Sequence, residues 1–263
     1  MSQSPAPNLV EGIGLHSGQP VKVGVSRGLK GAGVSFIRLG KKVPALVEQV
    51  TQTERGTSLA GISVVEHFLS AAFGGRYYDL VAAVEGGELP ALDGSALPWI
   101  EVFEKVAGQS SSPPIWALKK PLTVEDGGAR IEARPYRGFK VDFMIKFKGI
   151  GEQRFIFDAD KQDYKKEIAP ARTFGFIEEI EALRAKGLGL GASTDNALVL
   201  SANGFVNEPR FPDEPVRHKV LDLIGDLALF GQPINAEIKA VMSGHKLNIA
   251  LVRLLRQTFL AEK

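Results

Sequence analysis

His218 and Asp222 have the types and spacing that suit a metal ion. They lie four residues apart in the segment VRHKVLDLIGDLALFG, so on a helix both side chains project from the same face. The remainder of this segment is apolar on nearly every side, which predicts a buried helix. A buried carboxylate is costly unless something pairs with it, and a metal ion shared with His218 would do so. The alternative is an ion pair of Asp222 with Lys219 or Arg217 on the same helix.

A third candidate ligand, His67, lies far away in the chain, in the segment GISVVEHFLSAAFGG. Ser63 has the side chain of an N-cap and a glycine pair ends the segment, so we expect a short helix over residues 63–73. Glu66 directly precedes His67 and has two interpretations. It fits a capping box with Ser63, or it is a general base beside a ligand histidine. From these residues alone the capping box is preferred.

The supply of possible metal ligands is small. The chain has 4 histidines and 0 cysteines, which excludes thiolate zinc sites, iron–sulfur centres and a cysteine nucleophile. Two histidines and one carboxylate leave a fourth zinc position open, as catalytic sites do. These nitrogen and oxygen ligands favour zinc, and iron(II) or cobalt(II) would also fit. His245 is expected in a loop that opens the last helix, where an exposed imidazole can titrate near neutral pH.

Composition describes an ordinary globular protein. The 263 residues are 44% hydrophobic and 24% charged, so one or two domains with a substantial core are expected. The net charge of +2 and the scattered basic residues argue against nucleic-acid binding. The N-terminus lacks the apolar core of a signal peptide, and no stretch reaches transmembrane length. We therefore expect a cytoplasmic protein without stable membrane insertion.

The order of the predicted elements recurs in the two halves of the chain. A Ser/Pro-rich segment at residues 108–117 divides it into predicted domains 1–109 and 116–263. In each half, alternating stretches typical of antiparallel strands precede a helix, a strand, a loop and a second helix. The predicted fold is therefore α+β, with two related domains, each a mostly antiparallel sheet with helices. We expect the helices to lie between the two sheets, which would bring His67 close to His218 and Asp222.

The second half contains an additional segment, which we expect to form a β-α-β flap over about residues 171–200. Its helix is predicted from about 176 to 186 and leads through the glycine-rich stretch KGLGLGAS into a strand. These glycines follow a helix and match neither dinucleotide-binding nor P-loop spacing, which argues against a phosphate loop. The apolar side chains of the flap could pack on the core or line a channel for an apolar ligand.

Seven motifs, taken together and in order, resemble those of one family. They are EGIGLHSG, SVVEH, ELPALDGSA, ARTFGF, GLGLGAS, EPVRHKVLDLIGDL and SGHKLN. The chain resembles the UDP-3-O-acyl-N-acetylglucosamine deacetylases, zinc amidases of lipid A biosynthesis, over nearly its whole length. The resemblance implies a monomeric cytoplasmic enzyme with zinc (Zn²⁺) between the helices of its two domains. Its substrate would be UDP-3-O-acyl-N-acetylglucosamine, from which it would hydrolyse the N-acetyl group and release acetate.

The resemblance also implies a role for each candidate residue. His67, His218 and Asp222 match the zinc ligands. Glu66 matches the general base that takes a proton from the attacking water, which reverses the preference for a capping box. His245 matches the cation that stabilises the oxyanion or protonates the leaving amine, and Asp226 matches the carboxylate that orients it.

The other implied roles concern the substrate. Thr173 matches a catalytic hydroxyl near the scissile carbonyl, and Lys219 a lysine that contacts the substrate during catalysis. Phe174 and the flap after it match the passage for the acyl chain. His16 lies in a family motif without an assigned role. Between ERGTSLAG and ISVVEH the chain is shorter than the family pattern, so we expect an abbreviated insert in the first domain.

Two competing interpretations remain at the level of sequence. The chain could be a zinc-dependent amidase that acts on a different amide. It could also be a noncatalytic interaction module built on the same fold, although that predicts loss of the site residues, and all of them are present.

Overall fold

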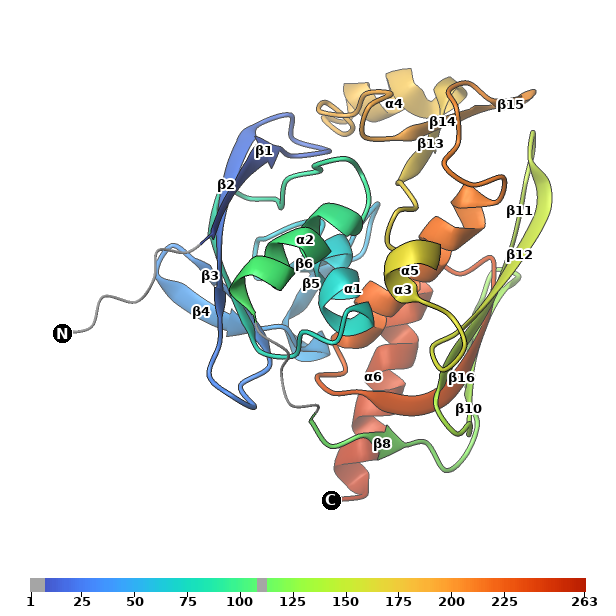
Figure 1. Ribbon diagram of the computed structural model, residues 1–263. Helices are drawn as coiled ribbons and strands as arrows, with labels where there is room; N and C mark the ends of the chain where they lie inside the picture. The colour runs from blue at the N-terminus through green and yellow to red at the C-terminus, as the bar shows by residue number, and fades with distance from the viewer. Residues whose placement is uncertain (1–7, 108–112) are drawn as a thin grey trace.

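Two β-sheets with helices between them form the body of the molecule (Figure 1). The computed structural model describes residues 8–107 and 113–263. The predicted α+β fold class is confirmed, and the main helices lie between the sheets as expected. The division into domains 1–109 and 116–263 stays a prediction. Residues 1–7 and 108–112, which include the start of the chain and half of the expected linker, lie outside the described residues.

The first sheet has the strand order β1-β2-β7-β3-β4, with β3 and β7 parallel and the other pairs antiparallel. In β2 the three valines at 21, 23 and 25 are buried and alternate with exposed or small residues, so one face of the strand is turned toward the helices. The strands are β1 (Asn8–Ile13), β2 (Pro20–Arg27), β3 (Val34–Arg38), β4 (Lys41–Pro44) and β7 (Leu80–Glu85). The adjoining elements are η1 (Val47–Gln49), the hairpin β5 (Val50–Gln52) and β6 (Ser58–Leu59), α1 (Glu66–Gly74) and α2 (Leu97–Val106).

The second sheet has the order β12-β11-β16-β10-β9, and β8 pairs with β16. As in the first sheet, one central pair, β11 and β16, is parallel within a mostly antiparallel arrangement. The strands are β8 (Trp116–Ala117), β9 (Leu122–Asp126), β10 (Ala129–Arg134), β11 (Phe139–Phe147), β12 (Gly151–Asp158) and β16 (Ile234–Val241). The helices of this half are α3 (Tyr164–Glu167), α5 (Glu214–Ala228) and α6 (His245–Ala261). No helix in the described ranges has the length and apolarity needed to cross a membrane.

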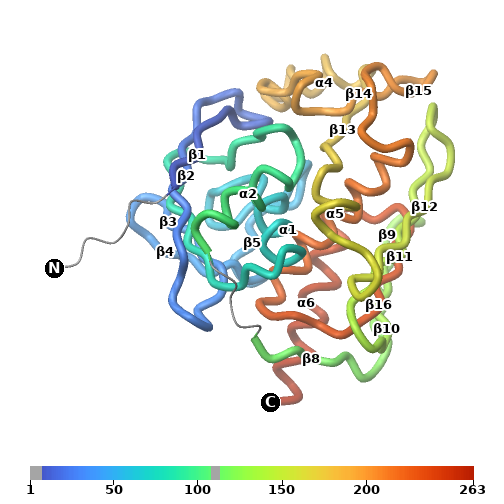
Figure 2. Tube along the Cα trace, in the orientation of Figure 1, coloured from blue at the N-terminus to red at the C-terminus, as the bar shows by residue number. Residues whose placement is uncertain are grey.

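The flap has the predicted β-α-β order and lies above α5 at one end of the molecule (Figures 1 and 2). Its first two strands are parallel, which requires the crossover through the helix. The helix predicted for 176–186 begins as a 3₁₀ turn and continues as α4. The elements are β13 (Phe174–Phe176), η2 (Ile177–Glu179), α4 (Ile180–Ala185), β14 (Leu198–Ser201) and β15 (Gly204–Phe205).

The capping box predicted at Ser63 is wrong. Helix α1 begins at Glu66, with Val65 as its N-cap and without a capping side chain in the described structure. The Ser63 amide donates instead to the carbonyl of Gly87, and its own carbonyl accepts from the amide of Leu89. Ser63 therefore belongs to an extended connection beside the 87–89 segment. This tertiary pairing takes the amide that the Glu66 carboxylate would have needed.

Helices α1 and α5, far apart in the sequence, cross at close range (Figure 2). Gly225 makes the approach possible, because a Cβ there would lie 2.1 Å from the Glu66 carbonyl oxygen. Four residues after Glu66 in α1, the Ser70 hydroxyl donates to the Leu221 carbonyl of α5 at 2.7 Å. The crossing therefore sets the position of the start of α1 against the middle of α5.

We predict that Gly225→Ala destabilises the protein. Alanine in a helix is ordinarily favoured over glycine by up to about 1 kcal/mol, but here the added methyl group must push α1 away. We expect the free energy of unfolding, measured by denaturant titration, to fall by about 1–3 kcal/mol. Gly87→Ala, at an exposed glycine with room for a Cβ, is the control. Equal or greater stability of Gly225→Ala would contradict the close crossing.

Candidate metal centre and active site

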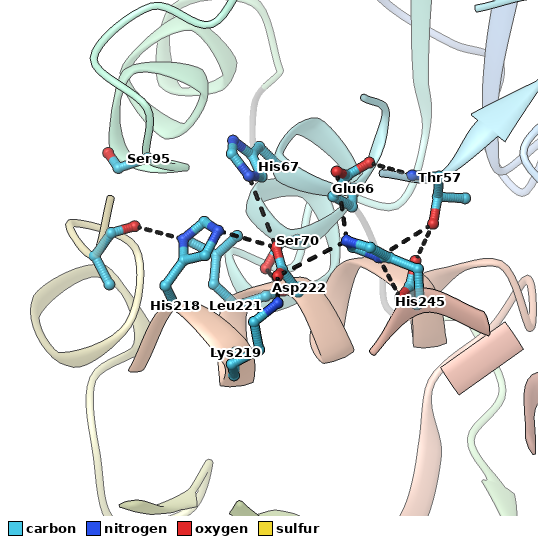
Figure 3. A network of polar contacts seen from close by, with 12 residues as sticks. Thr57, Glu66, His67, Ser70, Ser95, His218, Lys219, Leu221, Asp222 and His245 are labelled. Carbon is cyan, nitrogen blue, oxygen red and sulfur yellow. Dashed lines mark hydrogen bonds and ion pairs between the residues drawn. The ribbon is translucent and has the colours of Figure 1, made fainter. Parts of the chain in front are cut away.

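The crossing of α1 and α5 brings the three predicted metal ligands together (Figure 3). One ligand atom from each of His67, His218 and Asp222 lies within 4.8 Å of the others, and all three residues are buried. The Oδ1 atom of Asp222 lies 3.2 Å from Nε2 of His218 and 3.7 Å from Nε2 of His67. The two imidazole nitrogens thus face one carboxylate oxygen.

One carboxylate oxygen of Asp222 lies where a bound cation would stabilise it. Its Oδ2 atom accepts a hydrogen bond from Lys219 Nζ at 2.7 Å, whereas Oδ1 is buried without a hydrogen-bond partner among the described residues. Arg217, the other proposed partner, binds Asp213 and Glu167 instead. The ion-pair and metal interpretations are therefore compatible, because they use different oxygens. A divalent ion at Oδ1 would remove the cost of an unsatisfied buried carboxylate oxygen.

The protonation state of His67 and the orientation of the His218 ring also suit a metal. Burial, together with the nearby charge of His218, lowers the pKa of His67 to about 3, so its imidazole is neutral at neutral pH. His218 donates Nδ1–H to the Ala171 carbonyl at 3.1 Å, so Nε2 is the nitrogen that faces Asp222. Burial raises the pKa of Asp222, but His218 and Lys219 outweigh it and hold that pKa well below the usual value. Neutral imidazoles and an ionised carboxylate are the forms that bind metal.

Glu66 lies on the opposite side of Asp222 from His218 (Figure 3). Its Oε2 accepts a hydrogen bond from the Thr57 amide at 2.9 Å, and its Oε1 lies 3.8 Å from Nε2 of His245. Burial raises the pKa of Glu66 to about 7, with the charges of Asp222 and Asp226 adding to the effect and that of His245 opposing it. A carboxylate with such a pKa exchanges protons readily near neutrality.

His245 is better buried than the sequence predicted. It is the first residue of α6, not part of an exposed loop, and only 11% of its side chain is accessible. Its Nδ1 donates to Asp226 Oδ2 at 2.9 Å. Burial lowers the pKa of His245, but Asp226, followed by Glu66 and Asp222, outweighs it and raises the pKa to about 9. His245 is therefore a cation at neutral pH, with Nε2–H directed toward Glu66 and Asp222.

Three residues that were not predicted complete this polar network. Thr57 donates its hydroxyl to Asp226 Oδ1 at 2.5 Å, Asn248 donates to Oδ2 at 2.9 Å, and Ser243 donates to Asn248 at 2.7 Å. Asn248 could have been predicted, because it follows His245 by three residues and therefore lies on the same face of α6. The sequence gives no comparable signal for Thr57.

A cavity of about 770 Å³ opens beside the candidate ligands. Thr173, Phe174 and Lys219 line it, with Phe174 6.1 Å from the His218 ring and 5.6 Å from Lys219 Nζ. No residue of α4 is buried in the described structure, because the apolar side of the flap faces this cavity. The apolar side chains that line it from the flap are Phe176, Ile180, Leu183, Leu188, Ala197 and Val199.

His16 joins the first half of the chain to the glycine-rich turn of the flap. Its Nε2 donates to the Arg55 carbonyl at 2.9 Å, and its Nδ1 accepts from the Gly189 amide at 3.3 Å. A Cβ at Gly191 would lie 2.2 Å from the Gly14 carbonyl oxygen. Gly191, the last glycine of GLGLG, therefore allows the glycine-rich turn to lie directly against the loop that contains His16.

Comparison with known proteins shows close relatives of one kind. Residues 6–257 match the family UDP-3-O-acyl N-acetylglycosamine deacetylase (LpxC). The UDP-3-O-acyl-N-acetylglucosamine deacetylase of Thermosynechococcus vestitus is 40% identical, over 94% of this chain and 90% of its own length. The proteins of the same description from Phenylobacterium zucineum and Geotalea uraniireducens are 37% and 38% identical, covering 95% and 90% of this chain and 91% and 82% of their own lengths.

We predict that Asp222→Ala abolishes tight metal binding. Removing the carboxylate takes away the one anionic ligand and leaves the two imidazoles of the set. We expect at least about a 100-fold loss of zinc affinity, measured by competition with a chromophoric chelator. Asp213→Ala, which breaks only the ion pair with Arg217 near the start of the same helix, should keep full affinity. Full zinc occupancy of Asp222→Ala would remove Asp222 from the ligand set.

Proposed function

Because the chain belongs to the UDP-3-O-acyl N-acetylglycosamine deacetylase family, we propose that it hydrolyses the N-acetyl group of UDP-3-O-acyl-N-acetylglucosamine. The reaction is zinc-dependent, releases acetate and belongs to lipid A biosynthesis. The observation that carries the proposal is Oδ1 of Asp222, which has no hydrogen-bond partner among the residues that the structure describes and faces two imidazoles at the wall of an apolar cavity. A carboxylate and a cationic histidine flank it, as amide hydrolysis needs.

His67, His218 and Asp222 would hold the zinc ion. When bound, zinc supplies Lewis acidity, which polarises an amide carbonyl and lowers the pKa of water from about 16 toward 7. The protein fixes the orientation of the His218 ring, because the Nδ1–H of His218 is engaged by the Ala171 carbonyl. Zinc fits this set of two nitrogen ligands and one oxygen ligand with a position left for substrate or water.

Glu66 acts as the general base. It accepts a proton from the attacking water as the water oxygen bonds to the carbonyl carbon. The Thr57 amide holds Oε2, so Oε1 is the oxygen that faces His245 and the candidate metal site. The raised pKa of Glu66 makes it a stronger base than an exposed glutamate while it is still substantially ionised near neutral pH.

His245 acts as the cationic partner. Its Nε2–H donates to the developing oxyanion or to the nitrogen of the leaving amine, which gains a proton as the carbon–nitrogen bond breaks. Asp226 accepts from Nδ1 and so keeps the ring charged and oriented. The Thr173 hydroxyl, in the cavity wall, acts near the scissile carbonyl. The products are acetate and the free amine.

The cavity accommodates the rest of the substrate. We assign the acyl chain to the apolar wall formed by Phe174 and the flap, and a substrate contact to Lys219. The Lys219 ammonium is already engaged by Asp222, so it lies where the amide meets the candidate metal site.

The direct test is release of acetate from UDP-3-O-acyl-N-acetylglucosamine. We expect the purified protein to release it, to lose the activity on chelation and to regain it when zinc is returned. Matched substrates without the acyl chain or without the nucleotide should react at least about 10-fold more slowly, since remote binding energy contributes to turnover. Equal activity on simple N-acetyl sugars would indicate a different amidase. No release by folded, zinc-loaded protein would contradict the function and favour a noncatalytic role.

A second prediction concerns Glu66→Gln and pH. Activity requires Glu66 ionised and His245 protonated, so kcat/KM should rise through about pH 7 and fall through about pH 9. A bound cation lowers the pKa of both Glu66 and His245. The rise in kcat/KM should therefore occur no higher than about pH 7, and the fall no higher than about pH 9. Glu66→Gln should retain zinc and lose about 100- to 10,000-fold in kcat. Nearly full activity of this variant would exclude Glu66 as the base.

A further inference from the structure

Thr57 connects the two carboxylates that flank His245, and it does so across the two halves of the chain. Its amide donates to Oε2 of Glu66 at 2.9 Å, and its hydroxyl donates to Oδ1 of Asp226 at 2.5 Å (Figure 3). Glu66 begins α1, whereas Asp226 lies in α5, so one residue fixes both. Thr57 is 0% exposed, and it therefore acts on these side chains and not on a substrate.

The hydrogen bonds around Asp226 leave the Thr57 hydroxyl one role. Asp226 is 0% exposed, and its Oδ2 already accepts from His245 Nδ1 and Asn248 Nδ2, both at 2.9 Å. Thr57 Oγ1 also lies 3.3 Å from His245 Nδ1, but that nitrogen carries its proton toward Asp226. The hydroxyl proton therefore goes to Oδ1. It holds the plane of the carboxylate, and the carboxylate in turn holds the imidazole.

The backbone before Thr57 is shaped for this contact. Arg55 has a φ of 59° and Gly56 a φ of 154°, and both values are unfavourable for most side chains. A Cβ at Gly56 would lie 3.0 Å from Oε1 of Glu66. On the other side of the turn, the Arg55 carbonyl accepts from His16 Nε2. A strained turn held from both sides is typical of segments that position functional groups.

We propose that Thr57 is a positioning residue for the hydrolysis, which orients His245 through Asp226 and holds Glu66 through its own amide. This inference rests on the proposed function. The two contacts of Thr57 can be tested separately, because a substitution of the side chain removes the hydroxyl and keeps the amide. The alternative is that the hydroxyl serves only to hold the two halves of the chain together.

Thr57→Val tests the hydroxyl with little change of shape. We expect kcat for acetate release to fall about 10- to 100-fold, with KM within about 2-fold and zinc content unchanged. Thr57→Ser, which retains the hydroxyl, should recover most of the loss. Thr51→Val is the matched control, because it removes a threonine hydroxyl from the same hairpin, bonded only to the Ser58 carbonyl. It should leave both constants unchanged.

A double-mutant cycle with His245→Gln separates positioning from stability. If Thr57 acts through His245, Thr57→Val should cost less than about 3-fold in kcat once His245 is replaced. If the hydroxyl only stabilises the fold, the valine should cost the same in both backgrounds and lower the melting temperature in proportion. That additive result, or failure of serine to recover activity, would overturn the proposal.

Two controls keep the cycle interpretable. Thr57→Ala, which is smaller, takes the place of valine if the valine variant does not fold. The unsubstituted protein is assayed alongside: absence of acetate release there contradicts the proposed function, whereas release with an additive cycle contradicts only the role of Thr57.

Discussion

The burial of several carboxylates at one helix crossing is the constraint on which the rest of the structure depends. Glu66, Asp222 and Asp226 are all nearly inaccessible to water, and each needs compensation. Asp226 has three hydrogen-bond donors, and Glu66 has a backbone amide and the facing His245. Of these three carboxylates, only Asp222 has a fully buried oxygen without a hydrogen bond among the described residues. The demand for a cation at that oxygen thus follows from the packing of the helices.

The same packing explains the separation of roles among chemically similar groups. His67 is buried beside His218, and burial and this neighbour both favour the neutral form of His67. His245 lies among carboxylates, which favour its charged form. Within a few ångströms the fold therefore holds a neutral imidazole suited to a metal and a charged imidazole suited to an anion. The close approach at Gly225 brings these environments together.

The sequence predicted features that depend on local spacing or on the order of the elements, including the approach of His67 to His218 and Asp222, and it failed where individual tertiary contacts decide. The four-residue spacing of His218 and Asp222 and the alternation in β2 and β9 are local, and the corresponding elements have the expected form. Ser63 has the side chain of a helix cap, but pairing with residues 87–89 takes its backbone groups. The network around Asp226 was missed in part because Thr57 is 169 residues away from it in the chain. The role of Thr57 depends on a long-range contact, which the periodicity of the sequence does not predict.

The most direct test of the account is a crystal structure of the zinc-loaded protein with anomalous diffraction recorded at the zinc edge. The account predicts one strong peak between His67, His218 and Asp222, with metal–ligand distances of about 2.0–2.2 Å and the Asp222 bond formed by Oδ1. Lys219 should remain on the other oxygen. Zinc bound elsewhere, or an Asp222 carboxylate satisfied by protein groups alone in a zinc-saturated crystal, would contradict it.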